Sequence, residues 1–222
     1  MSLILNIDTA SEIAHINIAE DGVIIQEEKN TNQKDHAAFL QPAIYSLLKK
    51  AGNKINDLAA IAVNYGPGSY TGLRVGMASA KGLCFALTKP LVTVGALEML
   101  TTSALSSFKE SDIKSTLFCP MIDARRMEVF TAVYTSSLQV ISPPAALVLD
   151  NNSYVKVLLN NPAIFFGSGS PKWRNICNIK NGTFVDVPDN SLALSILSFK
   201  KFSQKSFANL AYSEPLYIKE FL

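Results

Sequence analysis

The order of apolar and polar residues at the start of the chain predicts three β-strands. Residues 3–10 form an apolar stretch that ends just after Asp8, and residues 13–19 alternate roughly between apolar and polar side chains. The Asp-Gly pair at 21–22 is typical of a hairpin turn, so residues 23–29 are expected to be the next strand. We therefore expect a meander with a carboxylate near the end of its first strand.

Helical periodicity follows. Residues 36–51 predict the first helix, because apolar residues recur there at spacings of three and four positions. Pro42 is tolerated only in the first turn of a helix, so the helix should begin near Leu40 or Gln41, or be kinked there. A second helix is expected over residues 71–87, where glycine and alanine leave little side-chain volume. Because a glycine in a helix interior costs about 1 kcal/mol, we expect the close approach of another helix to offset that cost.

A glycine-rich turn joins a buried strand to this second helix. The apolar run 59–63 predicts the strand, and Gly-Pro-Gly follows at 66–68. A strand, a glycine turn and a helix are the arrangement that directs backbone N–H groups at an anion, so phosphate binding is one interpretation. The spacing matches neither a Walker A loop nor a dinucleotide fingerprint, and a plain tight turn fits equally well.

The second half of the chain repeats the pattern of the first. Residues 116–123 predict a strand that ends in an acidic turn, and residues 127–134 predict the alternating strand after it. This repetition indicates a duplicated fold, and the polar stretch 106–114 is the best boundary, which gives units at 1–109 and 110–222. The other expected elements are a strand at 138–141, a break at Pro143-Pro144, a short helix at 152–160, strands at 163–166 and 184–187, a helix at 191–202 and a tail at 206–222.

Composition and charge narrow the possible functions. The chain of 222 residues is 48% hydrophobic with a formal net charge of +2, so tight nucleic-acid binding by this chain alone is not indicated. No apolar stretch approaches the ~20 residues of a membrane span, and the first residues do not predict a secretory leader. Three scattered cysteines predict buried thiols in a reducing cytosol, so we expect a cytoplasmic protein. Two histidines are too few for a histidine-rich metal centre. These residues are Cys84, Cys119, Cys177, His15 and His36.

Several residues could carry chemistry, and each has a structural alternative. Asp8 could help to hold a metal or could cap a turn. The Asp-Ala-Arg-Arg stretch at 123–126 could bind a phosphate or a carboxylate, or its carboxylate and one arginine could fix the turn. Gly-Ser-Gly at 167–169 could border a nucleotide. Ser69 lacks the Gly-x-Ser-x-Gly elbow of a hydrolase nucleophile, and His36 fits a cap or a packing role better than metal binding.

Six motifs are distributed over nearly the whole chain. The most specific is Gly-Pro-Gly-Ser-Tyr-Thr-Gly-Leu-Arg-Val-Gly at 66–76. The others are Ile4–Ala10, His36–Ile44, Val94–Glu98, Asp123–Val129 and Pro215–Lys219. Together they resemble the TsaB family, also known as YeaZ, whose main signature is similar to residues 66–76. Tyr70, Ala37 and Met127 depart from the family's usual Phe, Ser and Gly without removing a motif.

The resemblance implies a fold and a role. The fold is the actin-like ATPase fold (ASKHA, RNase H-like), an α/β architecture of two related halves, each with a mixed sheet flanked by helices. The role is that of a non-catalytic scaffold that pairs with a TsaD-like catalytic subunit and a TsaE-like ATPase. Their product is threonylcarbamoyladenosine next to the anticodon of tRNAs that read codons starting with A. tRNA would be met through the complex only, and no cofactor, metal or catalytic residue is implied for this chain.

Two positions favour this non-catalytic interpretation. The TsaD-like paralogue carries His-x-x-x-His on a helix after a strand like residues 90–94, and that pair would hold a divalent metal from one helix face. The matching positions here are Ala96 and Leu100, whose side chains have no lone pairs. Glu98 between them remains alone.

The resemblance also implies a partner interface, namely a helix bundle made by the first two helices of each subunit. The two helices at 36–51 and 71–87 would supply it, although part of either face could be internal core. Without the partner, the same surface could form a homodimer. The alternative is an actin-like ATPase or kinase that acts alone through Asp8, the turn at 66–68 and Asp123. The expected interface residues are His36, Leu40, Ala43, Ile44, Leu47, Tyr70, Leu73, Arg74, Met77, Ala80 and Cys84.

Overall fold

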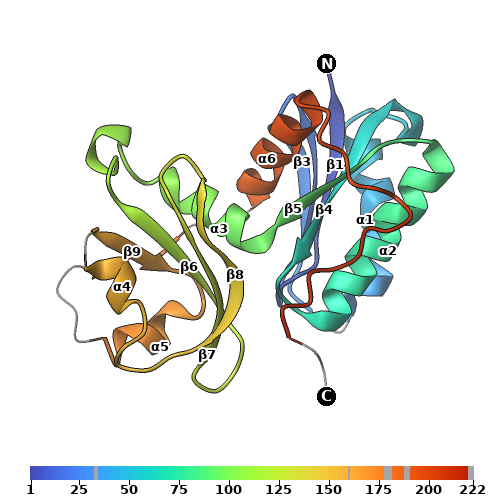
Figure 1. Ribbon diagram of the computed structural model, residues 1–222. Helices are drawn as coiled ribbons and strands as arrows, with labels where there is room; N and C mark the ends of the chain where they lie inside the picture. Colours follow the sequence, from blue (N-terminus) through green and yellow to red (C-terminus); the bar gives the residue numbers. More distant parts are fainter. Residues whose placement is uncertain (33–34, 160, 178–181, 188–190, 220–222) are drawn as a thin grey trace. The chain divides into compact units, whose positions relative to one another are not determined.

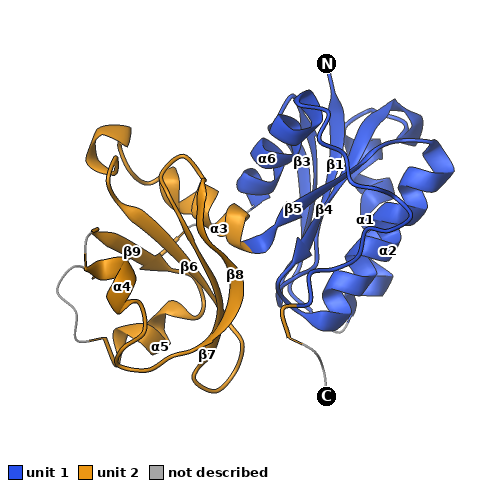
Figure 2. Ribbon diagram, viewed as in Figure 1, with its two compact units in different colours: residues 1–96, 190–217 blue, residues 97–189, 218–222 orange. Residues whose placement is uncertain are grey.

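Two five-stranded mixed sheets organise the chain, one in each of two compact units (Figure 1, Figure 2). The computed structural model describes residues 1–32, 35–159, 161–177, 182–187 and 191–219. Unit 1 comprises Met1–Ala96 and Asn190–Tyr217, and unit 2 comprises Leu97–Asp189 and Ile218–Leu222. Unit 1 is therefore assembled from two stretches of chain that are far apart in the sequence.

These units do not coincide with the halves 1–109 and 110–222 expected from the sequence. Helix α3 (Ala96–Leu105) lies in unit 2 apart from its first residue, because side chains such as Leu97 are buried in the unit 2 core. Helix α6 (Ser191–Ser203) returns to unit 1. α6 belongs to unit 1 because it packs on a sheet whose strands lie far away in the sequence. The local composition of residues 191–203 does not indicate this long-range contact.

The sheet of unit 1 has the strand order β3-β2-β1-β4-β5. The first three strands form the expected antiparallel meander, and β4 and β5 run parallel to β1. Helices α1 (His36–Lys50) and α2 (Tyr70–Leu87) cover one face, and α6 covers the other (Figure 1). The remaining bounds are β1 Leu3–Asp8, β2 Ala14–Glu20, β3 Val23–Asn30, η2 Ile55–Asp57, β4 Leu58–Gly66 and β5 Leu91–Gly95.

The start of α1 differs from the expected one. The helix begins at His36, and Pro42 lies inside it rather than in its first turn. Proline removes the N–H that would donate to the carbonyl four residues earlier, here that of Ala38. Both Pro42 and Ala38 are exposed, so solvent can satisfy that carbonyl and the helix continues through the proline.

Helix α6 docks on the sheet through polar side chains. Ser198 Oγ donates to Asn6 Oδ1 at 2.6 Å, and Asn6 Nδ2 donates to Asn17 Oδ1 at 2.9 Å. Ser195 Oγ donates to the same Asn17 oxygen at 3.1 Å. All four side chains are buried. Because buried polar groups are costly when unpaired, this network fixes the position of α6 on β1 and β2.

Unit 2 repeats the topology of unit 1. Its order is β10-β9-β6-β7-β8, with an antiparallel meander of β6, β7 and β8 and with β9 and β10 parallel to β6. The first strand of each unit is thus central, which confirms the predicted duplication. The bounds are η3 Glu110–Asp112, β6 Leu117–Asp123, β7 Glu128–Tyr134, β8 Val140–Val148, α4 Val155–Leu158, β9 Ala163–Phe166, α5 Ser170–Arg174 and β10 Gly182–Phe184.

Strand β8 overturns one expectation. Pro143 and Pro144 were expected to break the chain, yet β8 continues through both of them. β8 is an edge strand with β7 on one side only, so one of the two prolines can face the side without a ladder partner. The pair also coincides with a register shift between Thr131 and Val133 of β7, and proline is tolerated at such an irregularity. Two smaller elements also differ, since α4 is shorter than the expected helix 152–160 and β10 ends at Phe184 rather than Val187.

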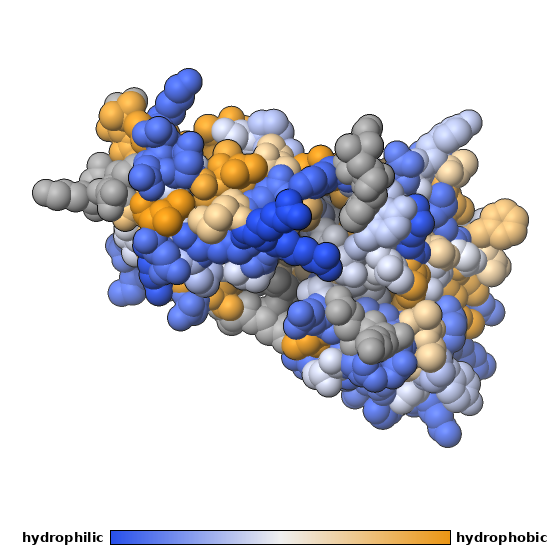
Figure 3. Space-filling view, turned by 90° about the horizontal axis from the view of Figure 1, so that it is seen from below, coloured by the Kyte–Doolittle hydropathy of each residue, from blue (hydrophilic) through white to orange (hydrophobic). Residues whose placement is uncertain are grey.

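The hydropathy of the helices and of the surface can be compared with that of a membrane protein. None of the helices within the described ranges has the length and hydropathy to cross a bilayer. Figure 3 shows hydrophobic residues reaching the surface in separate patches among hydrophilic ones. Cys84 and Cys119 are buried as expected, whereas Cys177 is partly exposed, and all three are free thiols.

Candidate partner-binding site

The glycine turn at the start of α2 is filled by the chain itself. The Ser69 N–H donates to the Ala10 carbonyl at 2.7 Å, and Thr9 Oγ1 donates to the Gly72 carbonyl at 2.7 Å. Ser69 Oγ caps the helix by accepting the Gly72 N–H at 3.3 Å. The Ser69 N–H could donate to a phosphate if it were free, but it is already hydrogen-bonded to the β1–β2 turn.

This contact explains most of the glycines in the motif. A Cβ atom at Gly68 would overlap the Ala10 carbonyl, and one at Gly72 would overlap the Thr9 carbonyl oxygen. At Gly76 a Cβ would overlap Thr9 Oγ1. The expectation that another helix requires the small residues of 71–87 is therefore wrong for Gly72 and Gly76. The β1–β2 turn of the same unit requires them.

Asp8 belongs to the same junction. Its Oδ1 accepts the Ala10 N–H and Asn64 Nδ2, each at 2.9 Å. Asn64 Oδ1 in turn accepts the Gly66 N–H at 2.9 Å. Asp8 thus ties the β1–β2 turn to the end of β4. Within the described ranges, no three His, Cys, Asp or Glu side chains are grouped so that they could hold a metal ion.

The structure places nine of the eleven expected interface residues inside unit 1. They are at most 3% exposed, because the apolar stripes of α1 and α2 pack on their own sheet. These side chains cannot contact a partner while unit 1 stays folded. Only Tyr70 and Arg74 reach solvent. The nine buried residues are His36, Leu40, Ala43, Ile44, Leu47, Leu73, Met77, Ala80 and Cys84.

Apart from Arg74, the residues expected from the sequence do not include the exposed sides of the same two helices. On α2, Arg74, Ala78, Gly82 and Phe85 follow one another at helical spacing and are all exposed, and Phe85 is 82% exposed. On α1, Tyr45 is 70% exposed. Because both helices cover the same face of the sheet, these exposed sides point away from it together. The sequence did contain a signal for these exposed sides, because each helix has a large aromatic residue outside its apolar stripe, Tyr45 on α1 and Phe85 on α2.

Gly82 differs from the glycines near the turn. A Cβ atom built there meets nothing within 4 Å. Its φ is negative, so the backbone does not require glycine either. Alanine would be more stable by about 1 kcal/mol in a helix interior. Nothing within the described part of the chain accounts for glycine at this position.

The C-terminal segment runs along α2. Lys81 Nζ donates to the carbonyls of Ala211 and Ser213 at 3.1 and 2.9 Å. Arg74 Nε donates to the Tyr217 hydroxyl at 3.0 Å, and the Arg74 guanidinium lies 3.9 Å from the centre of the Tyr70 ring. The two tyrosine rings are 5.0 Å apart. Arg74 therefore lies over the Tyr70 ring and is hydrogen-bonded to Tyr217, beside the exposed side of α2.

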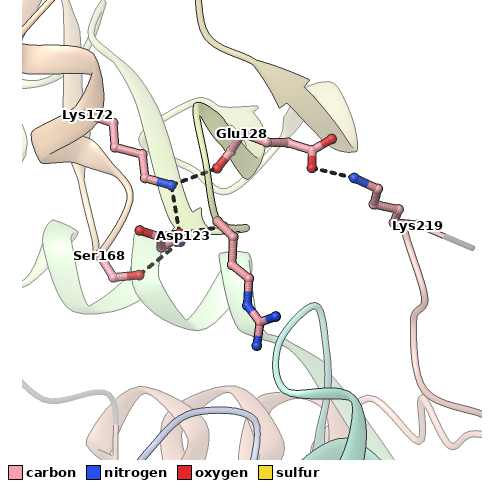
Figure 4. Close-up of polar contacts among 6 residues, drawn as sticks. Asp123, Glu128, Ser168, Lys172 and Lys219 are labelled. Carbon is pink, nitrogen blue, oxygen red and sulfur yellow. Dashed lines mark hydrogen bonds and ion pairs between the residues drawn. The ribbon is translucent and has the colours of Figure 1, made fainter. Parts of the chain in front are cut away.

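A separate polar cluster lies in unit 2 (Figure 4). Asp123 Oδ1 accepts the Arg125 N–H at 2.6 Å and Lys172 Nζ at 2.7 Å. Ser168 Oγ accepts the Asp123 N–H at 3.0 Å, and Lys219 pairs with Glu128 Oε2 at 2.7 Å. The Asp123 carboxylate therefore fixes the turn by binding the backbone N–H of Arg125, and not the Arg125 side chain.

The Gly-Ser-Gly stretch at 167–169 packs against this unit's own sheet. A Cβ at Gly167 would overlap the Met121 carbonyl oxygen, and one at Gly169 would come within 2.6 Å of Val129 Cγ1. The Gly169 N–H donates to the same Met121 carbonyl at 3.0 Å. These contacts give the two glycines a structural role.

Replacing Lys172 is expected to raise the pKa of Asp123. Partial burial raises the pKa of this carboxyl, but the hydrogen bonds from Lys172 and the Arg125 N–H outweigh it, so the pKa lies below its usual range. A lowered carboxyl pKa stabilises the fold above the unfolded-state pKa, and this contribution is lost as pH falls through the folded-state pKa. In Lys172→Met the pKa should move up towards the ordinary value, measured by NMR titration of the carboxyl carbon.

The matched control for this variant is Lys219→Met. Lys219 pairs with Glu128 and not with Asp123, so its removal should leave the Asp123 titration in place. An Asp123 pKa that is the same in Lys172→Met and in the wild type would contradict the assignment.

Comparisons with known proteins agree with the fold. A family model described as TsaD, tRNA N6-adenosine threonylcarbamoyltransferase, matches residues 23–208. The tRNA threonylcarbamoyladenosine biosynthesis protein TsaB of Bacillus subtilis (strain 168) is 32% identical over 167 residues, 74% of this chain and 70% of that protein. The TsaB of Haemophilus influenzae is 26% identical and covers 97% of this chain and 93% of its own. The structure of YeaZ from Pseudomonas aeruginosa matches with a TM-score of 0.76 at 23% identity, over 98% of this chain and 100% of that one.

The duplicated mixed sheets with helices on their faces define an actin-like α/β protein. In each sheet the unit's first strand has a parallel neighbour, β4 beside β1 and β9 beside β6. In unit 1 the β1–β2 turn contacts the start of α2. With a 32% identical relative covered over 70% of its length, and with a matching YeaZ structure, the chain belongs to the TsaB (YeaZ) family.

Proposed function

We propose that this chain is a non-catalytic subunit in tRNA threonylcarbamoyladenosine biosynthesis. It pairs with a TsaD-like catalytic subunit, a TsaE-like ATPase joins them, and tRNA is met through the complex only. The relatives named TsaB support the pathway. The observation that carries the partner role is the exposed side of α2, where a glycine that the chain itself does not need lies beside a solvent-exposed phenylalanine. A helix of another subunit can approach closely over Gly82 while Phe85 enters its surface.

Two positions support the non-catalytic part of the proposal. The matching family model is named after the TsaD enzyme. The resemblance to TsaD aligns that enzyme's metal-binding histidine pair with positions 96 and 100 of this chain. Ala96 is buried on α3 and Leu100 is packed against the unit 2 core. A methyl and an isobutyl group cannot ligate a metal, so the catalytic metal of the complex would be held by the partner.

The alternative function is an actin-like ATPase or kinase that acts alone. The contact between the β1–β2 turn and the glycine turn argues against it, because the Ser69 N–H, a donor that a phosphate could otherwise use, already donates to the Ala10 carbonyl. Isothermal titration calorimetry of the isolated chain with Mg-ATP separates the two functions. Micromolar binding would favour the enzyme.

Reconstitution tests the proposed function directly. The purified chain is combined with the TsaD-like and TsaE-like proteins of the same organism and assayed for tRNA modification. We expect full activity only when all three proteins are present, and none from this chain alone. Modification at the same rate without this chain would contradict a role as an essential subunit.

Gly82→Leu is expected to weaken association with the TsaD-like subunit by at least about 100-fold, because a buried interface tolerates little extra volume at a close helix contact. The isolated variant should be at least as stable as the wild type, since the added side chain meets open space. Affinity is measured by calorimetry and stability by urea unfolding.

Lys200→Leu is the matched control for Gly82→Leu. It places the same side chain at an exposed position of α6, on the other face of the unit 1 sheet. Equal loss of affinity in both variants, or no loss in Gly82→Leu, would remove α2 from the interface.

A further inference from the structure

The turn between β6 and β7 presents two adjacent arginines from an unusual backbone. Arg125 has φ +68° and Arg126 has φ +47°. Residues with a Cβ atom adopt this left-handed region only at an energetic cost, and glycine or asparagine are the usual residues there. Strained backbone of this kind clusters at active sites and ligand clamps.

Hydrogen bonds hold this turn in place. The Arg125 N–H donates to Asp123 Oδ1 at 2.6 Å. The Ala124 N–H donates to the Glu128 carbonyl at 3.1 Å, and the Glu128 N–H donates to the Arg125 carbonyl at 3.1 Å. The backbone that carries the two arginines is therefore fixed at both ends, and their side chains start from defined positions.

The carboxylates of the turn are already paired with lysines. Asp123 pairs with Lys172 and Glu128 pairs with Lys219, each at 2.7 Å (Figure 4). Arg125 and Arg126 are both exposed. Within the described part of the chain, no carboxylate forms an ion pair with either guanidinium. The turn therefore offers two uncompensated positive charges to an external anion.

We propose that Arg125 and Arg126 bind backbone phosphates of the tRNA when the chain is part of its complex. This inference rests on the proposed function. One guanidinium group can donate two parallel hydrogen bonds to the oxygens of one phosphate. Two successive arginines therefore match two successive phosphates of an RNA strand better than they match a single acidic side chain. The chain's net charge of only +2 fits a local contact that adds to the affinity of the assembly rather than an independent RNA-binding surface.

The test measures tRNA binding by the assembled complex as a function of salt. In Arg125→Gln/Arg126→Gln the affinity should fall about ten-fold at low salt. The slope of log K against log salt concentration should become shallower by about 1.4 to 1.8, since each lost phosphate contact removes about 0.7 to 0.9. Association with the TsaD-like subunit should be unchanged, which separates this contact from the α2 interface.

Two further variants serve as controls. Lys109→Gln/Lys114→Gln removes the same charge from exposed positions of the same unit and should leave the salt slope near that of the wild type. Arg125→Gly/Arg126→Gly suits the left-handed backbone, so its melting temperature should not fall below that of the wild type, although tRNA affinity should fall as in Arg125→Gln/Arg126→Gln.

Each outcome of these experiments decides the proposal. An unchanged salt slope in the arginine variants would overturn it, and so would an equal change in the lysine pair. Loss of association with the TsaD-like subunit in the arginine variants would assign the turn to a protein contact instead. If the wild-type chain fails to assemble at all, both the proposed function and this contact fall.

Discussion

Gly72→Ala is expected to lower the free energy of unfolding by at least about 3 kcal/mol. The new methyl group would overlap the Thr9 carbonyl oxygen and lie 3.1 Å from the Thr9 carbonyl carbon. Both are backbone atoms, and the Thr9 side chain is bonded to the Gly72 carbonyl, so neither side of the contact can move alone. Urea unfolding followed by circular dichroism measures the loss.

Gly82→Ala is the matched control, since it makes the same substitution three turns along the same helix. No atom lies within 4 Å of the added methyl group, so this variant should gain up to about 1 kcal/mol from the better helix propensity of alanine. A loss below about 1 kcal/mol in Gly72→Ala would mean that the β1–β2 turn relaxes, and the close contact would then not explain the glycine.

Leu47→Asp is expected to abolish folding of unit 1. Leu47 is 0% exposed in a cluster with Leu5, Ile7 and Met77. A carboxylate there would lose its hydration without a partner, at a cost of several kcal/mol. A domain is stable by only about 5 to 15 kcal/mol in all, and the lost packing of the leucine adds about 2 to 5 kcal/mol. Far-UV circular dichroism and size-exclusion chromatography of the purified variant measure the effect.

Tyr45→Asp introduces the same carboxylate two residues earlier on the same helix. Tyr45 is 70% exposed, so the fold should change in stability by no more than about 0.5 kcal/mol. Under the proposed function, this variant weakens association with the TsaD-like subunit while it remains folded. Native-like stability of Leu47→Asp would show that the apolar stripe of α1 does not face the core. The assignment of the buried and exposed faces of α1 would then be wrong.

The sequence predicted the fold well where local pattern and tertiary structure agree. The alternation at 13–19 and the Asp-Gly turn at 21–22 determine the first hairpin, and the echo around Asp123 revealed the second unit. The expectation of a break at Pro143 and Pro144 was wrong because β8 is an edge strand with a register shift at this pair, and both features tolerate proline. Edge position depends on the order of strands in the sheet, which a local pattern does not contain.

The candidate site was harder to predict than the fold. An apolar stripe such as that around Leu47 and Met77 has the same periodicity whether it faces a sheet of its own chain or another subunit. The glycines at 72 and 82 look alike in the sequence, although one is pressed against Thr9 and the other faces open space. Only the neighbours in three dimensions separate a residue that the chain needs from one that it does not.

The polar docking of α6 sets how long the unit 1 sheet stays uncovered on one face during synthesis. The hydrogen bond between Ser198 and Asn6 joins residues 192 positions apart. At about 5 to 20 residues per second, a ribosome makes the second partner roughly 10 to 40 seconds after the first. During that interval all strands of unit 2 are made, while one face of the first sheet still lacks its helix. Unit 1 therefore receives its last helix only after every strand of both sheets has been made.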